Sequence, residues 1–239
     1  MNLVSSASLL LLKYSAYFYK QCNKNLSARP WSNQQLRRMS NLVLGDVVNV
    51  SAWQDSDKQG SKYQHYFKNC KSYAITNYKG SRADGLYDIS NIKTLEYDLS
   101  CKASFEHTFD CVLNHTTLEH IFDIDTALDN LVNLTRDLLV LIVPYYQAFH
   151  QEHGSYGDYL RFSPLYLYQA MKARSITPMV ITTNTNPVFP NYVFCIASKN
   201  PLLNLKIQEL YSKDNLLVNQ VWKNLESLPH VLTSRPFLV

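Results

Sequence analysis

Glycine is scarce in this sequence, at six of 239 residues. No G-x-G-x-x-G segment follows the first apolar run, which argues against a dinucleotide-binding dehydrogenase. The five cysteines are scattered and none belongs to a C-x-x-C pair, so neither a zinc site nor a disulfide framework is indicated. Scattered thiols in odd number fit a reducing compartment, and we expect a cytoplasmic protein.

Acidic residues are missing from residues 1–45. The basic residues of this segment are Lys13, Lys20, Lys24, Arg29, Arg37 and Arg38, which leaves 17 basic against 19 acidic residues in the rest of the chain. A basic extension before a near-neutral domain favours an anionic surface such as membrane headgroups, nucleic acid or an acidic partner. The alternative is a solvated helix packed on the domain. Nucleic acid ranks last because the aromatic residues here form no recognisable stacking motif.

A long apolar run is also lacking. The stretch at residues 4–12 is too short to span a bilayer, which takes about 20 apolar residues, so we expect no transmembrane segment. No basic residue precedes this stretch, which argues against a secretion signal, whereas the missing acidic residues leave an organelle transit segment open.

What is present indicates one α/β domain. The chain is 46% hydrophobic and 18% charged, as in globular proteins, and apolar runs alternate with helical stretches from residue 46 onward. The pattern predicts strands over 47–51, 72–77, 94–98, 109–114, 138–143, 179–183 and 192–197. It predicts helices over 8–20, 32–44, 125–135 and 164–174, with Asp125 and Ser163 as caps of the last two. We therefore expect a basic helical extension at 1–45, the domain at 46–200 and a helical tail at 201–239.

Two segments carry a specific resemblance. Residues 109–123 change abruptly from an apolar strand to polar residues and then a helix, and open α/β sheets bind ligands at such junctions. This segment resembles the fourth motif of class I S-adenosylmethionine-dependent methyltransferases, an "FD-V-apolar" strand followed by "-LEH-". Residues 157–164, Gly-Asp-Tyr-Leu-Arg-Phe-Ser-Pro, resemble the "DYWRF-[ST]-P" signature of the type 11-like branch, which is associated with glycan and small-metabolite modification.

The resemblance implies a three-layer, Rossmann-like α/β fold with seven strands. It also implies S-adenosyl-L-methionine as the cofactor and methyl transfer to a small-molecule or glycan-linked acceptor. It places the cofactor at the carboxyl ends of the first four strands. The implied cofactor-binding residues are Asn49, Ser51, Ala52, Trp53, Asn77, Asp98, Leu99, Asn114 and His115.

The cofactor side departs from the family at two places. Ser51 and Trp53 stand where the family has glycines that let the backbone turn tightly. Either the indole blocks the cofactor's path, or the backbone takes a different course and the indole stacks in or lines the pocket. Asn77 replaces the acid that accepts hydrogen bonds from the ribose hydroxyls, although its amide still offers an oxygen. Asp98 keeps the acid that faces the adenine, with a turn former or helix cap as its alternative role.

The substrate side is indicated by the segment 143–162, from which we take His150, His153, Tyr159 and Arg161 as catalytic candidates. The two histidines titrate near neutral pH and are suited to accept a proton. Arg161 offers a planar fork for a carboxylate or phosphate, or pairs with Asp158. Because the segment lacks the H-E-x-x-H order, we expect no metal site.

A second function remains open, that of a methyltransferase-like pseudoenzyme whose pocket or basic N-terminus binds a partner. The discriminating feature is the loop at 51–57. An indole of Trp53 that points into the cleft favours this second function.

Overall fold

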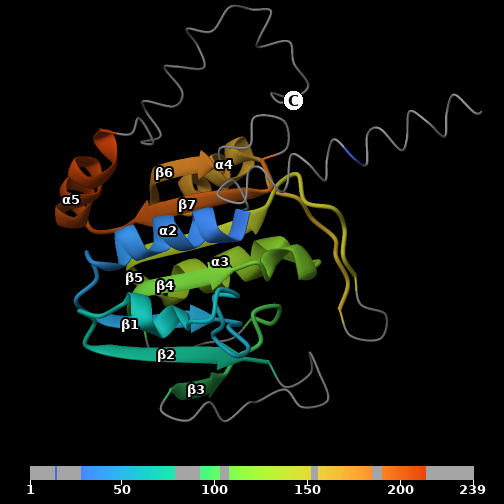
Figure 1. Ribbon diagram of the computed structural model, residues 1–239, viewed down its shortest axis with the longest axis horizontal. Helices are drawn as coiled ribbons and strands as arrows, with labels where there is room; N and C mark the ends of the chain where they lie inside the picture. Colours follow the sequence, from blue (N-terminus) through green and yellow to red (C-terminus); the bar gives the residue numbers. More distant parts are fainter. Residues whose placement is uncertain are drawn as a thin grey trace, which may run out of the picture.

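The computed structural model describes residue 14 and residues 28–78, 92–102, 108–151, 156–184 and 190–213. All of the helix predicted at 8–20 except residue 14, the candidate His153 and most of the predicted C-terminal tail lie outside these residues. The described parts form one sheet with helices on both faces (Figure 1).

The sheet has seven strands in the order β3-β2-β1-β4-β5-β7-β6. Their bounds are Asp46–Val50 (β1), Ser72–Asn77 (β2), Lys93–Glu96 (β3), Phe109–His115 (β4), Thr135–Pro144 (β5), Thr177–Thr183 (β6) and Tyr192–Ser198 (β7). Neighbours from β3 to β5 are parallel, whereas β7 runs antiparallel to both β5 and β6. The strand order reverses between β1 and β4, and in open α/β sheets this switch point is where ligands bind. The expected seven-stranded α/β fold is confirmed.

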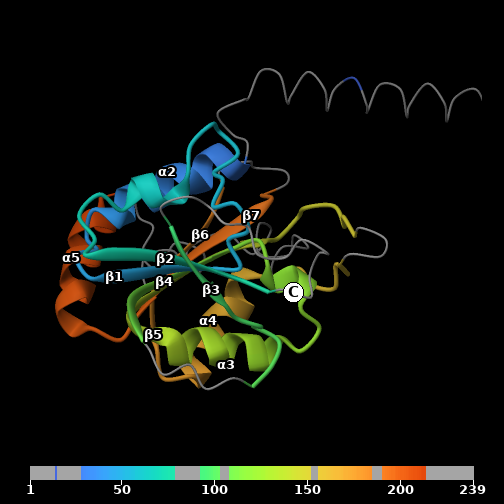
Figure 2. The same ribbon diagram turned by 90° about the horizontal axis from the view of Figure 1, so that it is seen from below.

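Helices make the outer two of three layers (Figure 2). On one face lie α3 (Ile124–Leu134) and α4 (Pro164–Ala173), and on the other lie α2 (Ala28–Ser40), the 3-10 helix η2 (Tyr63–Tyr66) and α5 (Pro201–Ser212). The central strand β5 supplies both cores, since Leu139 and Leu141 pack on the α3 side while Val140 and Ile142 pack on the α2 side. Burial on both faces explains why this strand reads as a continuous apolar run.

Two helix boundaries differ from the sequence prediction. α2 begins at Ala28 and ends at Ser40, so the predicted range 32–44 was wrong at both ends. Pro30 does not interrupt this helix because it lies in the first turn, where its missing N–H would have no helical partner. α3 is capped by Asp123, whose carboxylate accepts from the Thr126 N–H at 3.2 Å, and not by Asp125.

The prediction for α4 is confirmed, because Ser163 Oγ accepts from the Tyr166 N–H at 3.1 Å and Pro164 opens the helix. In α5, Asn200 is the cap and Tyr211 is fully buried. The guanidinium of Arg38 in α2 lies 4.6 Å from the ring centroid of Tyr211, so α2 and α5 pack together on the sheet. The division of the chain at residues 45 and 200 stays a prediction.

The described arginines of the basic N-terminal segment all make contacts within the domain. Arg37 donates to the hydroxyl of Tyr66 at 2.6 Å and pairs with Asp57 at 3.3 Å, while Arg29 and Arg38 contact β4 and α5 respectively. All three arginines thus have partners within the domain, and the expected binding to an anionic surface would depend mainly on the lysines before residue 28. None of the helices in the described residues is both long and apolar enough to cross a membrane.

Candidate functional site

The turn after β1 contains non-glycine residues in backbone conformations that glycine favours. Ser51 and Trp53 have φ values of 57° and 50°, in the left-handed region that favours glycine. The turn is anchored to β2, because the N–H groups of Ser51 and Ala52 donate to the side chain and main chain of Thr76, both at 3.0 Å. The backbone at these two positions thus has the conformation that glycine favours, at a cost of about 1–2 kcal/mol per residue.

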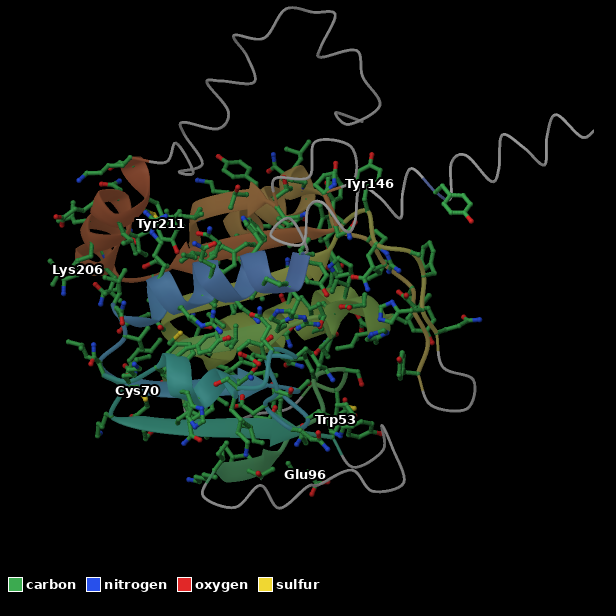
Figure 3. All side chains as sticks on the ribbon, in the orientation of Figure 1. Trp53, Cys70, Glu96, Tyr146, Lys206 and Tyr211 are labelled. Atoms are coloured by element: carbon green, nitrogen blue, oxygen red, sulfur yellow. The ribbon has the colours of Figure 1, made fainter. Side chains whose placement is uncertain are left out.

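Asn77, at the end of β2, binds this turn with both ends of its amide. The Trp53 N–H donates to Asn77 Oδ1 at 2.7 Å, and Asn77 Nδ2 donates to the Trp53 carbonyl at 3.0 Å. Asn77 is only 5% exposed. The indole of Trp53 is half-buried beside the carboxyl end of β2, with its ring centroid 5.0 Å from the Lys58 ammonium (Figure 3).

Asn49 lies below the turn and binds a buried acid. Its amide donates to Asp55 Oδ1 at 2.8 Å, and the same carboxylate accepts from the Tyr73 hydroxyl at 2.7 Å and the Gln64 N–H at 2.9 Å. Burial raises the pKa of Asp55 despite these three donors. The described contact of the Asn49 side chain thus stabilises the loop. Sequence reasoning missed Asp55, which lies two residues after Trp53.

Asp57 fixes the far side of the same loop. Its carboxylate is fully buried and accepts from the N–H groups of Gln59 and Ser61 at 2.7 and 2.9 Å and from the Tyr66 hydroxyl at 2.6 Å. Burial works to raise the pKa of Asp57, but these hydrogen bonds outweigh it and the pKa lies below its ordinary value. The loop is therefore held by two buried acids, one at each side.

Asp98 follows β3 and forms a turn. Its Oδ1 accepts from both the N–H and the hydroxyl of Ser100, at 2.9 and 2.6 Å, and these contacts lower the pKa of Asp98 against the effect of its partial burial. This is the turn-forming role that the sequence left as an alternative, and a carboxylate with four lone-pair sites retains capacity for a further donor. Leu99 is buried, and its carbonyl accepts from Asn130 at 2.9 Å.

Asn114 lies at the carboxyl end of β4, beside β1. Its Nδ2 donates to the Val50 carbonyl at 3.0 Å, and it is fully buried. Among the described residues, nothing donates a hydrogen bond to Asn114 Oδ1. A buried carbonyl oxygen in this state is costly, and it lies at the topological switch point where a ligand donor is expected.

His115, the next residue, binds an arginine from the N-terminal segment. Arg29 Nη1 lies 2.9 and 3.0 Å from the two ring nitrogens of His115 and donates to the Tyr63 hydroxyl at 3.1 Å, while Nη2 donates to the Tyr192 hydroxyl at 3.3 Å. Burial, and then the charge of Arg29, lower the pKa of His115 well below its usual value, so the imidazole is neutral. Sequence reasoning missed Arg29, and no local motif marks it.

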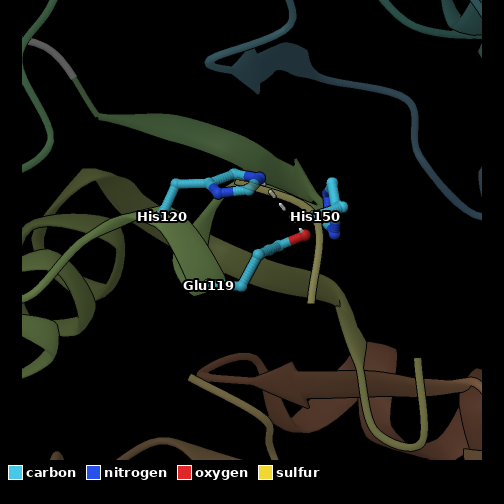
Figure 4. Close-up of side chains that lie close together, drawn as sticks. All are labelled: Glu119, His120 and His150. Carbon is cyan, nitrogen blue, oxygen red and sulfur yellow. Dashed lines mark ion pairs between the residues drawn. The ribbon is translucent and has the colours of Figure 1, made fainter. Parts of the chain in front are cut away.

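The substrate side brings together Glu119, His120 and His150 (Figure 4). The -LEH- segment forms a short 3-10 helix, η4 (Leu118–His120), after β4. His120 Nε2 lies 3.7 Å from Glu119 Oε1. Burial raises the pKa of the Glu119 carboxyl to about 7. Glu119 and His120 are the last two residues of the -LEH- segment, and their place in this motif at the end of β4 is the sequence signal that marks them.

His150 is oriented by Asp158, and Arg161 holds Asp158 in turn. His150 Nδ1 lies 3.0 Å from Asp158 Oδ2, and the main-chain N–H of His150 donates to the same oxygen at 2.6 Å. Arg161 binds the Asp158 carboxylate with both Nη atoms, at 2.5 and 2.8 Å, and donates to the carbonyls of Gln147 and Ala148 at 2.7 and 2.9 Å. The guanidinium fork is thus committed to positioning the segment before His150.

Tyr159 is half-exposed, and its ring packs edge-on against Phe122 with centroids 5.6 Å apart. Its N–H donates to the Glu119 carbonyl at 2.7 Å, which ties the two substrate-side segments together. Of the four catalytic candidates, the structure therefore brings His150, Tyr159 and Arg161 to one region, while His153 lies outside the described residues.

Comparison with known proteins finds similarity in structure alone, since no protein-family model and no curated protein matches the chain. It is similar to 1,6-didemethyltoxoflavin-N1-methyltransferase of Burkholderia thailandensis, whose crystal structure holds 1,6-didemethyltoxoflavin and S-adenosylhomocysteine, with a TM-score of 0.54, 14% identity and coverage of 84% of this chain and 91% of that one. The chain is also similar to an S-adenosylmethionine-dependent methyltransferase of Clostridium acetobutylicum, with a TM-score of 0.53, 10% identity and coverage of 79% of this chain and 98% of that one.

The [4+2]-cyclase SpnF is also similar, with a TM-score of 0.50, 9% identity and coverage of 70% of this chain and 80% of that one. At such identities the likeness establishes the fold, which is that of class I methyltransferases, with strand order 3-2-1-4-5-7-6 and an antiparallel β7. The chemistry must be argued from the site, because one fold hosts several reactions. The type 11-like branch stays a prediction.

Proposed function

We propose that this chain is an S-adenosylmethionine-dependent methyltransferase that acts on a small-molecule or glycan-linked acceptor. The observation that carries the proposal is the turn after β1, where Ser51 and Trp53 adopt left-handed backbone conformations although neither is glycine. A fold bears such strain only where the surrounding structure enforces it, and strained turns cluster at ligand sites. The turn lies at the carboxyl edge where this fold binds ligands.

Polar atoms along this edge suit the cofactor. Asn114 Oδ1 is a buried acceptor that has no donor in the described parts of the chain, and an ammonium group of the ligand would satisfy it. Asp98 retains a lone pair for a hydroxyl or amine. Asn77 has a different role in this proposal, which is to hold the turn at Trp53 in shape. Ala52, Leu99 and His115 would line the site around these groups.

The cofactor supplies an electrophilic methyl group, so the chain must align the acceptor and, where the reacting atom carries a proton, remove it. We propose His150 as the base, because Asp158 occupies its Nδ1–H and leaves Nε2 to accept the proton. Arg161 is a positioning residue for Asp158, and Tyr159 lines the acceptor site. His153 stays a candidate from sequence alone.

The test is methyl transfer from isotopically labelled S-adenosylmethionine into fractionated metabolites and glycans. We expect label in a small-molecule or glycan fraction with the wild-type chain, and a loss of about 10²-fold or more with His150→Ala, the usual scale for a general base. Cofactor affinity should be unchanged in the variant. No transfer above a heat-denatured control, into any fraction, contradicts the proposal.

A second candidate is a pseudoenzyme that keeps the fold and binds a partner. The specific observation in its favour is Asn77, an amide in the place of the ribose-binding acid whose two ends both bind Trp53. Cofactor binding separates the two candidates, because the pseudoenzyme requires none.

A further inference from the structure

We propose that Glu119, His120 and His150 bind a divalent transition-metal ion of the Zn²⁺ class. One ligand atom from each residue lies within 4.8 Å of the other two. Ligands around a tetrahedral Zn²⁺ at about 2.0–2.1 Å are separated by about 3.3 Å. The 3.7 Å between His120 Nε2 and Glu119 Oε1 is already close to this value. His150 is 40% exposed and lies in a loop, so a small side-chain movement would complete the geometry.

The two imidazoles are arranged as metal ligands usually are. His120 Nδ1 lies 2.6 Å from the Gly157 carbonyl, which can only accept, so Nδ1 carries the proton and Nε2 presents its lone pair toward Glu119. Asp158 holds Nδ1 of His150 in the same way at 3.0 Å. Metal-binding histidines commonly donate their second N–H to a carbonyl or carboxylate, which fixes both ring and tautomer. Here two histidines from different segments share that arrangement.

Glu119 provides an independent observation. Its carboxylate is fully buried, and neither oxygen has a hydrogen-bond partner within the described residues. It points toward the two imidazoles (Figure 4). A buried carboxylate without donors is expensive, and such groups in native structures are paired or coordinate metals. A cation between Glu119 and the two imidazoles would supply the missing partner.

The donor set decides the kind of ion. Two imidazole nitrogens and one carboxylate oxygen suit Zn²⁺, Fe²⁺ or Co²⁺, whereas Mg²⁺ prefers oxygen ligands and keeps its waters. Three protein ligands leave a coordination position open, as in catalytic zinc sites. An acceptor oxygen bound there would lose its proton more readily, and that proton would pass to water, because His150 would then be a ligand of the ion and not the base. That use rests on the proposed function, whereas metal binding itself does not.

Sequence reasoning missed this site because it considered only His150 and its neighbours at 152 and 153. Glu119 and His120 are about thirty residues away and reach His150 only through the fold. The spacing of residues within the segment 150–153 does not match a known metal-binding motif. The other two ligands of the proposed site, Glu119 and His120, belong to η4.

The test uses the full chain, stripped with a chelator and titrated without S-adenosylmethionine. Calorimetry should show one Zn²⁺ per chain, and Co²⁺ should give ligand-field absorption without a thiolate charge-transfer band. Mg²⁺ should not compete. His150→Ala and Glu119→Gln should each weaken Zn²⁺ binding by more than about 100-fold, beyond the range for loss of an outer-shell partner. His65→Ala, at an exposed histidine of η2, is the matched control and should bind like the wild type.

Two results would overturn the proposal. One is no Zn²⁺ or Co²⁺ binding up to millimolar concentration. The other is binding that survives in both His150→Ala and Glu119→Gln, or that shows a thiolate band, which would assign the ion to an exposed cysteine such as Cys101. Because these titrations omit S-adenosylmethionine, their failure is separate from failure of the methyltransferase proposal.

Discussion

Asn77 and Trp53 are joined by two hydrogen bonds, from the Trp53 N–H to Asn77 Oδ1 at 2.7 Å and from Asn77 Nδ2 to the Trp53 carbonyl at 3.0 Å. A side-chain amide matches a peptide group in this way because it carries both an acceptor oxygen and a donor NH2 group, and an aspartate would lack the donor. The amide of Asn77 therefore holds the turn at Trp53, whose φ of 50° is left-handed although the residue is not glycine.

The first prediction concerns this pair. Asn77→Ala removes both hydrogen bonds and leaves main-chain groups of the turn unpaired, so the free energy of unfolding should fall by about 1–3 kcal/mol. Denaturant unfolding measures the change. Gln54→Ala, at an exposed position in the same loop, is the control and should change little. An Asn77→Ala protein as stable as the wild type would show that the two bonds do not hold the turn.

Ser51 tests the strain in the turn. Its φ of 57° costs about 1–2 kcal/mol for an L-residue. Glycine removes this strain, but it also loses more conformational entropy on folding, so only part of the cost is recovered. Ser51→Gly should raise the free energy of unfolding by up to about 1 kcal/mol, and Ser51→Val should lower it because β-branched residues disfavour this region. If the glycine variant proves less stable than the valine variant in the same unfolding assay, the backbone assignment is wrong.

His115 predicts a pH dependence. Its pKa is lowered well below 6.5 in the folded chain, so below pH 6.5 the unfolded chain takes up a proton that the folded chain does not. The contribution of His115 to the free energy of unfolding is complete above pH 6.5. It is lost as the pH falls toward the pKa that His115 has in the folded chain. Between pH 7.5 and 5.5 the wild type should lose about 1.4 kcal/mol more than His115→Gln. Equal losses in the two proteins, measured by urea unfolding at both pH values, would contradict this.

Arg161 is predicted to act through position. Arg161→Lys keeps the charge but loses the fork that binds Asp158 and the Gln147 and Ala148 carbonyls. We expect a loss of about 1–3 kcal/mol in unfolding free energy and faster proteolysis between residues 145 and 151. S-adenosylhomocysteine affinity should not change. A variant with normal proteolysis and weaker cofactor binding would place Arg161 in the cofactor site instead.

The sequence predicted those strands and helix caps whose formation depends on residues close together in the chain. The apolar run of β4 and the cap Ser163 with Pro164 were recognisable because their signals lie within a few residues. The pair of Asn77 and Trp53 spans 24 residues, and Arg29 reaches His115 across 86, so neither contact leaves a local trace. Glu119 was visible as part of a motif, but its burial and its distance to His150 depend on the packing of the loop after β5.

The most direct test of the central claim is calorimetric titration of the full chain with S-adenosylmethionine and, separately, with S-adenosylhomocysteine. We predict binding of both at micromolar concentrations with one site per chain. If neither compound binds at concentrations up to millimolar, the methyltransferase assignment is contradicted and the binding-protein alternative takes its place.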